Sequence, residues 1–582
     1  MPNDPAPNRP TRPNVVLVIT DDQGYPDLGC TGNPWLRTPN IDRFAAEAVR
    51  CDDFHVQPLC TPTRGAIMSG HRPAYNGAWA TCWGRSLLDA RETTLGDLFA
   101  AAGYRTGMFG KWHLGDNYPF RPQDRGFEHV VAHKGGGVGQ TPDFWGNNYF
   151  DDTYFHNGRP VEHTGYCTDV WFEQAMAWIE RTAGEPFFCY VATNAPHSPY
   201  LVADEYRRMY EDIAGIREPA FYGMITNIDE NFAKLRAKLA ELGIEDDTIL
   251  VFMTDNGSSA SAHMDETGHE TGGYNANLRG MKGSFYDGGH KVPFLLRWPG
   301  GALTAPRAVT EMCLDVDLLP TFVDLCDLPA PEGDPPDGVS IAPLLRGQAD
   351  RLDDDRVHFL HNHQGTEPPD MWKGAAMTRR WRLVGGRELY DIAADPSQRA
   401  DVADEHPDVV ERLRGAYQRW YRSVAPRMRE YCPIVIGHDA ENPTRLDAMD
   451  VMGDVAWHQT HIVQAKRSTG QWTVRVARAG RYRFRLRRWP EELGLPVDAD
   501  VDADEARRHI YAPPDGPHAA IHPTGARLGI AGAEWTRPVA PGDMEATFEV
   551  DLEPCERTAL DAWFTDGDDA CGAYYVYVER LD

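Results

Sequence analysis

Short apolar segments rich in valine alternate with segments of helical periodicity along the first half of the chain. Asn14–Thr20 is a continuous apolar segment of the kind typical of parallel strands that are buried on both faces. An amphipathic helix is expected to begin at Asn40. The alternation continues with a helix expected at 94–102, strands at 105–109 and 187–193, a long helix at 222–242 and a strand at 248–253. This order predicts a large α/β domain with a mainly parallel sheet flanked by helices.

Four polar clusters directly follow expected strands. They are Asp21-Asp22, Lys111-Trp112-His113, Asn194-Ala195-Pro196-His197 and Asp255-Asn256. In open α/β sheets, ligands bind beyond the carboxyl ends of the strands. We therefore expect the four clusters to converge on one site.

The chain divides into parts that differ in pattern. A stretch rich in Pro, Asp and Gly at 329–338 is expected to link a catalytic α/β domain, residues 14–335, to a smaller α+β subdomain, residues 336–434. We expect an accessory antiparallel β module at 435–582. The polar, proline-rich residues 1–13 are expected to form a disordered tail.

Alternating apolar positions predict the strands of the β module. Residues 471–490 alternate on both sides of Ala479-Gly480 and are expected to form a β-hairpin. Further strands are expected at 546–552, 560–564 and 573–578.

The charge balance excludes some kinds of partner. With 58 Lys and Arg against 87 Asp and Glu, the net charge is −29, so neither a nucleic acid nor an anionic membrane is expected as a main partner. No stretch approaches the ~20 apolar residues of a membrane span. The N-terminus shows no secretory signal and the 11 cysteines show no paired spacing. A cytoplasmic location is expected, or a periplasmic one if the N-terminus was trimmed.

The segment 60–65, Cys-Thr-Pro-Thr-Arg-Gly, places a cysteine just before an expected helix at 64–70. A thiol at a helix N-terminus is expected to have a lowered pKa and to face an anion site. A buried structural cysteine is the ordinary alternative. The wider pattern, Cys60-x-Pro-x-Arg64 with Ser69-Gly70-His71 after it, resembles the signature of the formylglycine-dependent sulfatase family. In that family the cysteine is oxidised to formylglycine, whose hydrated aldehyde is the nucleophile.

The resemblance covers roughly residues 14–421 in the order that the family uses. The matching blocks include the four polar clusters, two of them within 110–115 and 254–257, and further blocks at 278–283 and 388–391. The resemblance implies an arylsulfatase-like enzyme with the large, mainly parallel sheet of the alkaline-phosphatase-like superfamily.

Asp21, Asp22, Asp255 and Asn256 form a set of oxygen ligands suited to a hard divalent cation. The family resemblance implies Ca2+, which would also contact the modified Cys60. For any one of these aspartates alone, a turn or helix-cap role is the alternative.

The resemblance also implies the catalytic roles. Lys111, Lys282 and Arg64 are expected to hold the sulfate group, and Arg64 also to hold the hydrated aldehyde. His197 with Lys282 would assist the leaving alkoxide or phenoxide as an enzyme–sulfate ester forms. His113 would then take a proton from the remaining hydroxyl, so that sulfate leaves by carbon–oxygen cleavage and the aldehyde is restored.

Several features around the expected pocket have two interpretations. The glycine-rich loop 133–139 is expected to cover the pocket, with His133 or Lys134 as possible sulfate contacts; it lacks the end of a P-loop. The segment with His263 and His269 is expected to be a mobile rim loop rather than a second metal site. Lys291 stands where the family often has Arg, and we expect a structural role.

Three further groups of residues each have a functional and a structural interpretation. Five aromatic residues are either a stacking wall for substrate or loop packing: Trp145, Tyr149, Phe150, Tyr154 and Phe155. Three histidines resemble a metal site only superficially: His358, His361 and His363. Seven arginines are either an anionic-glycan surface or, as we expect, ion-paired: Arg475, Arg478, Arg481, Arg483, Arg485, Arg487 and Arg488.

The leading hypothesis is a sulfatase that acts on an aryl sulfate or a sulfated carbohydrate after maturation by a formylglycine-generating enzyme. Two other functions stay open from the sequence: a phosphate or phosphonate monoester hydrolase of the same superfamily, and a non-catalytic glycan-binding protein on a sulfatase scaffold. The pocket-rim loops that decide the substrate are the least readable from sequence. An oligomer is possible.

Overall fold

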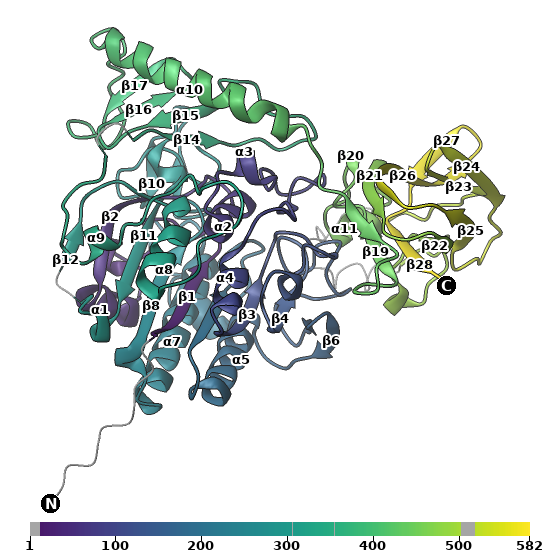
Figure 1. The fold of residues 1–582 in the computed structure, drawn as a ribbon, viewed down its shortest axis with the longest axis horizontal. Helices are drawn as coiled ribbons and strands as arrows, with labels where there is room; N and C mark the ends of the chain where they lie inside the picture. The colour runs from purple at the N-terminus through teal and green to yellow at the C-terminus, as the bar shows by residue number, and fades with distance from the viewer. Residues whose placement is uncertain (1–11, 305–306, 354–355, 502–517) are drawn as a thin grey trace, which may run out of the picture.

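The computed structural model describes residues 12–304, 307–353, 356–501 and 518–582. Figure 1 shows an α/β body, a helix-and-sheet subdomain along one side of it, and a β module that projects from it. Of the tail expected at 1–13, only Arg12 and Pro13 are among the described residues.

An 11-stranded mixed sheet forms the centre of the body, in the order β12-β2-β11-β8-β1-β7-β3-β4-β5-β6, with β13 paired to β2. The central strands from β8 to β4 are parallel, which confirms the expected sheet, and β11 is antiparallel to both of its neighbours. The strands are β1 (Asn14–Thr20), β2 (Val49–His55), β3 (Arg105–Lys111), β4 (His129–His133), β5 (Thr153–His156), β6 (Arg159–Glu162), β7 (Phe187–Ala192), β8 (Thr248–Thr254), β11 (Lys291–Arg297), β12 (Arg307–Val309) and β13 (Cys313–Leu314).

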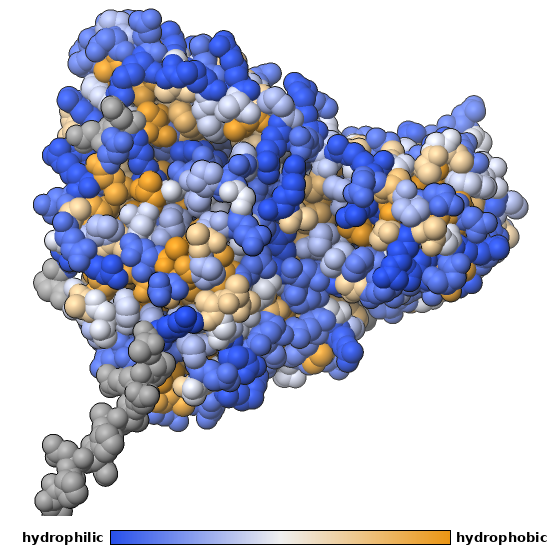
Figure 2. All heavy atoms as spheres, viewed as in Figure 1, coloured by the Kyte–Doolittle hydropathy of each residue, from blue (hydrophilic) through white to orange (hydrophobic). Residues whose placement is uncertain are grey.

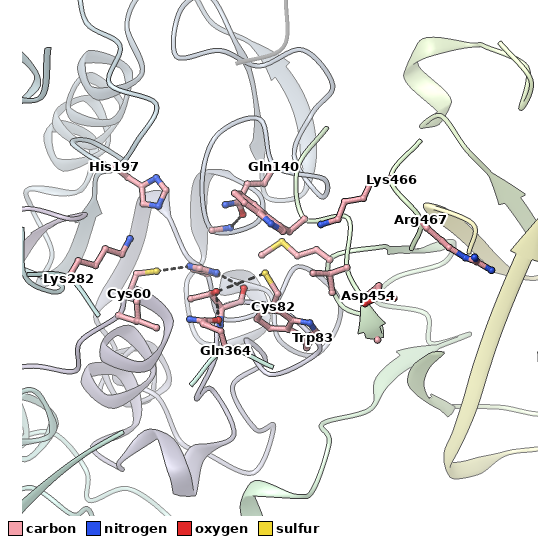
Figure 3. Close-up of a pocket in the computed structure, with 18 residues that line it drawn as sticks. Cys60, Cys82, Trp83, Gln140, His197, Lys282, Gln364, Asp454, Lys466 and Arg467 are labelled. Atoms are coloured by element: carbon pink, nitrogen blue, oxygen red, sulfur yellow. Dashed lines mark hydrogen bonds between the residues drawn. The ribbon is translucent and has the colours of Figure 1, made fainter. Parts of the chain in front are cut away.

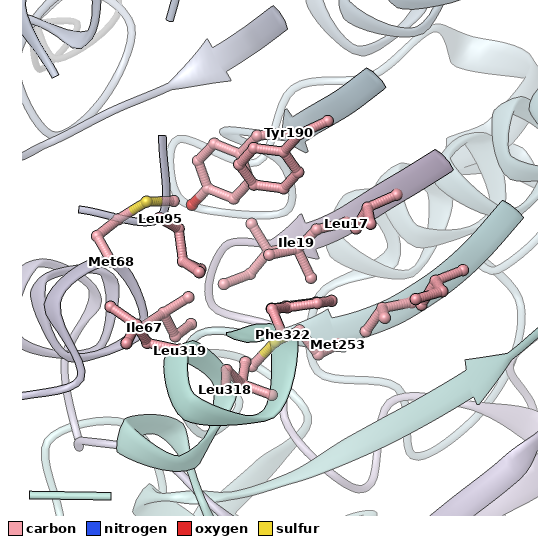
Figure 4. Close-up of a cluster of buried hydrophobic side chains, with 14 of the residues drawn as sticks. Leu17, Ile19, Ile67, Met68, Leu95, Tyr190, Met253, Leu318, Leu319 and Phe322 are labelled. Atoms are coloured by element: carbon pink, nitrogen blue, oxygen red, sulfur yellow. The ribbon is translucent and has the colours of Figure 1, made fainter. Parts of the chain in front are cut away.

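Helices cover both faces of this sheet because its central strands have no polar face. Every residue of β1 is buried, and alternate side chains enter different cores. Leu17 and Ile19 pack against one group of helices (Figure 4), whereas Val16 and Val18 pack against the other. The first group is α2 (Cys60–Ser69), α4 (Leu95–Ala101) and α8 (Leu318–Cys326), and the second is α1 (Pro39–Glu47), α5 (Cys167–Thr182) and α7 (Pro219–Glu241).

Short elements complete the body. They are the helices α3 (Pro73–Asn76), α6 (Asp204–Arg208) and α9 (Ala342–Leu345) and the strands β9 (Ala262–Met264) and β10 (Glu270–Gly273). The stretch 329–338 contains no regular element and packs on the body, where Arg72 Nη1 donates to Asp337 Oδ1 over 2.6 Å. None of the described helices is long and apolar enough to cross a membrane.

The subdomain after this stretch is a four-stranded antiparallel sheet covered by one long helix, α10 (Pro407–Met428). Its strands are β14 (His358–His361), β15 (Gly374–Met377), β16 (Trp381–Val384) and β17 (Glu388–Asp391). Apolar side chains of α10, among them Leu413 and Tyr417, pack on the sheet. His361 Nε2 lies 2.8 Å from Tyr417 Oη, and His358 and His361 belong to none of the potential metal-binding groups of the described residues.

The C-terminal module is a sandwich of two sheets with the strand orders β18-β21-β26-β23-β24 and β19-β28-β22-β25, in which β20 and β27 extend the first. Among its described strand pairs, only β18 with β21 is parallel. The elements are β18 (Ile434–Ile436), β19 (Thr444–Asp447), β20 (Met452–Asp454), α11 (Gln459–Val463), β21 (Thr469–Val476), β22 (Gly480–Arg487), β23 (Gly525–Ile530), β24 (Ala533–Pro538), β25 (Ala546–Leu552), β26 (Cys555–Asp566), β27 (Asp569–Gly572) and β28 (Tyr575–Arg580).

The hairpin expected within 471–490 is wrong. β21 pairs with β18, β20 and β26, whereas β22 pairs with β25 and β28, so the two strands belong to different sheets. Trp472 and Val474 of one strand and Tyr482 and Phe484 of the other are buried in the same core. Apolar residues alternate in the same way in a hairpin and in two strands that face each other across a sandwich, so the pattern did not distinguish them.

Six of the seven arginines of the module form ion pairs, as expected, whereas Arg488 donates to backbone carbonyl oxygens, among them that of Ile462. Arg483 bridges Glu549 and Glu579, Arg487 pairs with Glu545, and Arg488 is buried beneath Trp489. Hydrophilic side chains accordingly cover much of the visible face of the module (Figure 2).

The module and the body share one core. Cys82, Leu87 and Phe120 of the body belong to the buried cluster of the sandwich. Polar contacts cross the same boundary: the Trp83 amide donates to the Met449 carbonyl oxygen over 2.9 Å, and the Tyr575 hydroxyl donates to the Thr141 carbonyl oxygen over 3.0 Å. The module is therefore fixed to the body by both apolar and polar contacts.

A buried ion pair links the body to the α10 subdomain. Arg382 of β16 donates to Asp287 over 2.9 Å, and both side chains are almost fully buried. Burial by itself would raise the pKa of Asp287, but the arginine lowers it to about 2. His55 and His290 complete this cluster, with their Nδ1 atoms 2.9 Å apart.

Replacing the arginine of this pair should destabilise the protein strongly. Arg382→Met leaves the Asp287 carboxylate buried without its cation, and we expect a loss of about 3 to 5 kcal/mol. Chemical unfolding followed by tryptophan fluorescence measures this loss. Arg380→Met removes an exposed ion-pair partner of Asp391 next to β16. This control variant should leave the midpoint of chemical unfolding almost unchanged. Equal midpoints for the two variants would contradict a structural role for the buried pair.

Candidate functional site

Four neighbouring strands end at one edge of the sheet and bring the predicted polar clusters together. The strand order β8-β1-β7-β3 places Asp255, Asp21, Asn194 and Lys111 beyond adjacent carboxyl ends. Helix α2 begins at this edge with Cys60. The expected convergence is therefore present in the structure.

Three carboxylates form the base of the site. One carboxylate oxygen each of Asp21, Asp22 and Asp255 lies within 4.8 Å of the others, and all three residues are buried. The Asn256 amide donates to Asp22 Oδ1 over 3.0 Å. Asp22 also has a left-handed backbone, with φ 65°, and its amide donates to Asp255 Oδ1. This strained conformation is held by the contacts around it.

Each carboxylate has a cationic neighbour. Lys111 Nζ lies 2.6 Å from Asp21 Oδ2, and Lys282 Nζ lies 2.5 Å from Asp22 Oδ1. Arg64 donates to Asp255 Oδ2 through both Nε and Nη2. The three cations predicted from sequence therefore lie in direct contact with the carboxylates.

Burial and charge act in opposite directions on these groups. Burial raises the pKa of Asp21 well above its usual value despite Lys111. Burial also acts to raise the pKa of Asp22, but Lys282 and His197 hold it below its usual value. Burial therefore outweighs the charge of Lys111 at Asp21, whereas the nearby positive charges outweigh burial at Asp22.

The residues present fit a hard divalent cation. Asp21 Oδ1 and Asn256 Oδ1 are among the buried oxygens of the described residues that have no hydrogen-bond partner, and both belong to the expected ligand set. An all-oxygen set of three carboxylates and an amide is the chemistry that Ca2+ or Mg2+ prefers. Lys111 and Lys282 already neutralise part of the acidic charge, so a bound cation shares the carboxylates with them.

Cys60 lies in the first turn of α2, four residues earlier than the helix start expected from sequence. Its Sγ lies 3.4 Å from His113 Nδ1, and the residue is 3% exposed. The expected lowered pKa is wrong: burial raises the pKa of the Cys60 thiol, and Lys111 only partly offsets this effect. Enclosure from solvent outweighs the helix N-terminus and the nearby cation, so the thiol is neutral.

His113 faces Cys60 through a defined ring nitrogen. Its Nε2 lies 3.1 Å from the Thr81 carbonyl oxygen, which can only accept, so Nε2 holds the proton and Nδ1 faces Cys60 as an acceptor. Burial and Lys111 lower the pKa of His113 well below its usual value. Gly136 packs against this ring: a methyl group on Gly136 would lie 2.2 Å from His113 Cε1.

His197 lies on the opposite side of the carboxylates. Its Nδ1 lies 2.6 Å from the Ser198 carbonyl oxygen and therefore donates, and its Nε2 lies 3.7 Å from Asp22 Oδ2. Burial lowers the pKa of His197 to about 4, although Asp22 acts against this shift. The Tyr149 hydroxyl donates to the His197 carbonyl oxygen over 3.1 Å and supports its backbone.

A cavity of about 520 Å3 opens above these side chains. Figure 3 shows Cys60, His197 and Lys282 at one end and Lys466 and Arg467 toward the other. Its volume lies within the ~300–1,000 Å3 range of small-ligand sites. The body and the α10 subdomain contribute Leu59, Cys60, Thr81, Cys82, Trp83, His113, Gly136, Gln140, His197, Lys282 and Gln364, and the β module contributes Met449, Gly453, Asp454, Val455, Trp457, Lys466 and Arg467.

The glycine-rich loop covers the cavity through other residues than expected. Gly136 and Gln140 line it, whereas His133 and Lys134 do not. His133 is buried beside Trp171, and the Lys134 ammonium lies over the Phe155 ring. The two residues considered as possible sulfate contacts therefore do not line this cavity.

The structure also shows where the other residues expected near the pocket rim lie. None of the five aromatic residues between 145 and 155 lines the cavity, and Trp145 packs on Trp489, which agrees with loop packing. His263 and His269 belong to an antiparallel pair, β9 with β10, and its link, and neither lines the cavity. Lys291 pairs with Asp53 over 3.1 Å, in agreement with a structural role.

Sequence reasoning missed the lining residues that come from distant segments. Trp83 and Trp457 are the tryptophans of the cavity, and both lie in irregular segments without a motif. Lys466 and Arg467 lie before β21 and were not distinguished from other surface cations. No signal in the sequence places residues 449–467 beside Cys60, because that proximity depends on how the β module docks.

Comparison with known proteins agrees with this geometry. A family model described as Sulfatase matches residues 13–328, and one described as N-sulphoglucosamine sulphohydrolase, C-terminal, matches residues 281–419. Arylsulfatase A of Homo sapiens is 29% identical over 460 residues, covering 69% of this chain and 86% of that protein. N-acetylgalactosamine-6-sulfatase of Homo sapiens is 30% identical over 366 residues, covering 59% and 68%.

Among solved structures, Ps i-CgsB in complex with k-i-k-neocarrahexaose is similar with a TM-score of 0.64 and 26% identity. The superposition covers 72% of this chain and 95% of that chain. Residues 420–582, which include the β module, lie outside both family-model matches.

Removing one carboxylate should weaken metal binding. Asp21→Asn takes away one negative charge and the oxygen that lacks a partner, so we expect calcium affinity to fall by at least about tenfold. Calorimetric titration of chelator-treated protein with CaCl2 measures this change.

Asp27→Asn is the matched control for this variant. Asp27 is a buried aspartate that accepts from the Gly24 amide and lies outside the carboxylate group, so its replacement should leave calcium binding intact. Unchanged affinity in Asp21→Asn, with an unchanged melting temperature, would show that the metal binds elsewhere.

Proposed function

The chain belongs to the sulfatase family and is a sulfuric ester hydrolase, and we propose that it acts through a formylglycine made from Cys60 and a divalent cation held by Asp21, Asp22, Asp255 and Asn256. The observation that supports this most directly is the position of Cys60. Its Sγ faces His113 Nδ1 in a cavity whose lining residues His197 and Lys282 contact Asp22 of the acidic group.

The two groups that the proposal adds have defined chemistry. A divalent cation polarises the oxygens of a sulfate group, and a hydrated aldehyde at position 60 supplies a hydroxyl nucleophile where a neutral, enclosed thiol does not. Side chains of the protein itself bind the sulfate group and transfer protons.

The cations bind and orient the sulfate. Lys282 lines the cavity, and Lys111 lies beneath it against Asp21. Both ammonium groups are held by carboxylates, so their positions are fixed before substrate arrives and little reorganisation is needed. Arg64 holds Asp255 and donates to the Lys111 carbonyl oxygen, so its main effect is to position the base of the site.

The two histidines transfer protons through different ring nitrogens. His113 accepts at Nδ1, because Thr81 fixes its proton on Nε2. His197 presents Nε2 to the cavity, because its Nδ1 donates to Ser198. Burial keeps His197 neutral in the free protein, and a bound anionic group raises its affinity for a proton, which the leaving oxygen then receives.

The substrate proposed is a sulfate monoester of a sugar or an aryl alcohol. Relatives include an arylsulfatase and an N-acetylgalactosamine-6-sulfatase, and Ps i-CgsB is solved with a neocarrahexaose. The cavity is wide enough for a group larger than sulfate, and Trp83 and Trp457 give it apolar surface suited to a ring.

Crowding His113 should impair the proposed proton transfer. Gly136→Ala adds a methyl group against the imidazole, so the ring must move away from position 60, and we expect kcat on 4-nitrophenyl sulfate to fall by about 100-fold. Gly184→Ala is the control, because a methyl group there meets nothing within 4 Å. Equal activity of the two variants would contradict the assigned role of His113.

The formylglycine proposal is tested by mass spectrometry of the tryptic peptide 51–64 from protein co-produced with a formylglycine-generating enzyme. We expect Cys60 to lose its sulfur and gain an aldehyde oxygen while Cys51 stays a thiol. Cys60→Ala should then abolish hydrolysis of 4-nitrophenyl sulfate while keeping the melting temperature. Cys51→Ala removes the other thiol of the same peptide, which lies in the core, and should keep turnover.

Two outcomes would contradict the proposal. An unmodified Cys60 in protein made with a maturing enzyme that modifies a control substrate would remove the nucleophile. Rates on an aryl phosphonate ester that exceed those on the matched aryl sulfate would favour phosphonate hydrolysis instead.

A further inference from the structure

We propose that the C-terminal β module forms a second anion-binding subsite in the cavity, with Lys466 and Arg467 as its cations and Trp457 as its apolar wall. The substrate class inferred is a sulfated saccharide that has a second anionic group, a sulfate or a carboxylate, beside the ester that is cleaved. This inference rests on the proposed function and specifies its substrate.

The cavity is built by two parts of the chain. Seven of its 18 lining residues come from the β module, from Met449 to Arg467. Asp454, Lys466 and Arg467 lie toward the end opposite Cys60, His197 and Lys282 (Figure 3). A ligand bound through its sulfate at Cys60 therefore extends toward the module.

The far end of the cavity has an excess of positive charge. Lys466 and Arg467 are exposed, although the chain as a whole has a net charge of −29. Within the described part of the chain, the Lys466 ammonium has no ion pair or hydrogen bond, whereas Arg467 Nη1 forms an exposed ion pair with Asp569 Oδ1 at 4.0 Å. Asp454 is the acidic residue of this wall, and it accepts from the Thr469 hydroxyl over 2.9 Å.

The backbone that presents these residues is fixed. The Thr141 amide donates to the Trp457 carbonyl oxygen over 3.2 Å, and the Tyr574 hydroxyl donates to the Lys466 carbonyl oxygen over 2.8 Å. The side chain of Tyr574 is buried. A charged group held on an anchored backbone loses little freedom when it binds an anion.

The chemistry of this wall favours an anionic sugar over a neutral aryl group. Lys466 and Arg467 are donors suited to sulfate or carboxylate oxygens, and the exposed part of Trp457 is suited to the apolar face of a sugar ring. Lys466 lies nearer than Arg467 to the Cys60 end of the cavity (Figure 3). A neutral substrate uses the sulfate end alone and gains nothing from the module.

The experiment compares three substrates in matched variants. The substrates are 4-nitrophenyl sulfate, a monosulfated disaccharide, and the disulfated disaccharide of the same skeleton with its second sulfate on the neighbouring ring. The test variants are Lys466→Gln and the double variant Lys466→Gln with Arg467→Gln. The control is Lys234→Gln, which removes an exposed lysine of α7 outside the cavity.

We expect wild-type protein to prefer the disulfated disaccharide and the double variant to lose about tenfold in kcat/KM on it, mainly through KM. The other two substrates, and every substrate of Lys234→Gln, should change less than twofold. The preference should also weaken as NaCl rises from 0.05 to 0.5 M, because exposed cations are screened.

Equal losses on all three substrates, or no preference in wild-type protein that hydrolyses them, would overturn the subsite and leave the proposed function intact. Hydrolysis of none of the substrates by protein whose Cys60 has become an aldehyde would overturn the proposed function, and the subsite with it.

Discussion

The structure depends on the need to neutralise three buried carboxylates at one edge of the sheet. Asp21, Asp22 and Asp255 are placed there by strands that are apolar on both faces and so leave their first polar residues at the carboxyl ends. Lys111, Lys282 and Arg64 supply the opposing charges. In the proposed function, the cations that neutralise this acidic group also hold the sulfate group of the substrate. Stability and substrate binding therefore draw on one set of contacts.

The two ends of the cavity differ in their burial and in the pairing of their charges. At the Cys60 end, burial is nearly complete, the charges are paired and the histidines have assigned protons. At the other end, Lys466 and Arg467 are exposed and their charges are screened by solvent. The first arrangement suits chemistry on a fixed group, whereas the second suits selection among substrates, because exposed cations contribute modestly and depend on salt.

The sequence predicted the parts of the fold that follow from local pattern. The bounds of β1 and β25 match the expected strands, and the polar residues that follow β1, β3, β7 and β8 meet as expected, since parallel strands end at the same edge. The pairing partners of β21 and β22 were not predictable, because the period of two is the same for every partner. The pKa of Cys60 was predicted in the wrong direction because enclosure by His113 and the cavity walls is a property of packing. Trp457 and Lys466 were missed for a similar reason: their proximity to Cys60 arises only when the module docks.

The position of β28 has a consequence for the order in which the protein matures. β28 pairs with both β19 and β22 inside its sheet, so the sandwich closes only after Tyr575–Arg580 have been synthesised. Because the module supplies one wall of the cavity, the surroundings of residue 60 stay incomplete until that moment. In the proposed maturation, a modifying enzyme therefore reaches Cys60 most easily before β28 has paired with its two neighbours. Pairing of β28 thus controls the access of other proteins to a residue more than 500 positions earlier in the sequence.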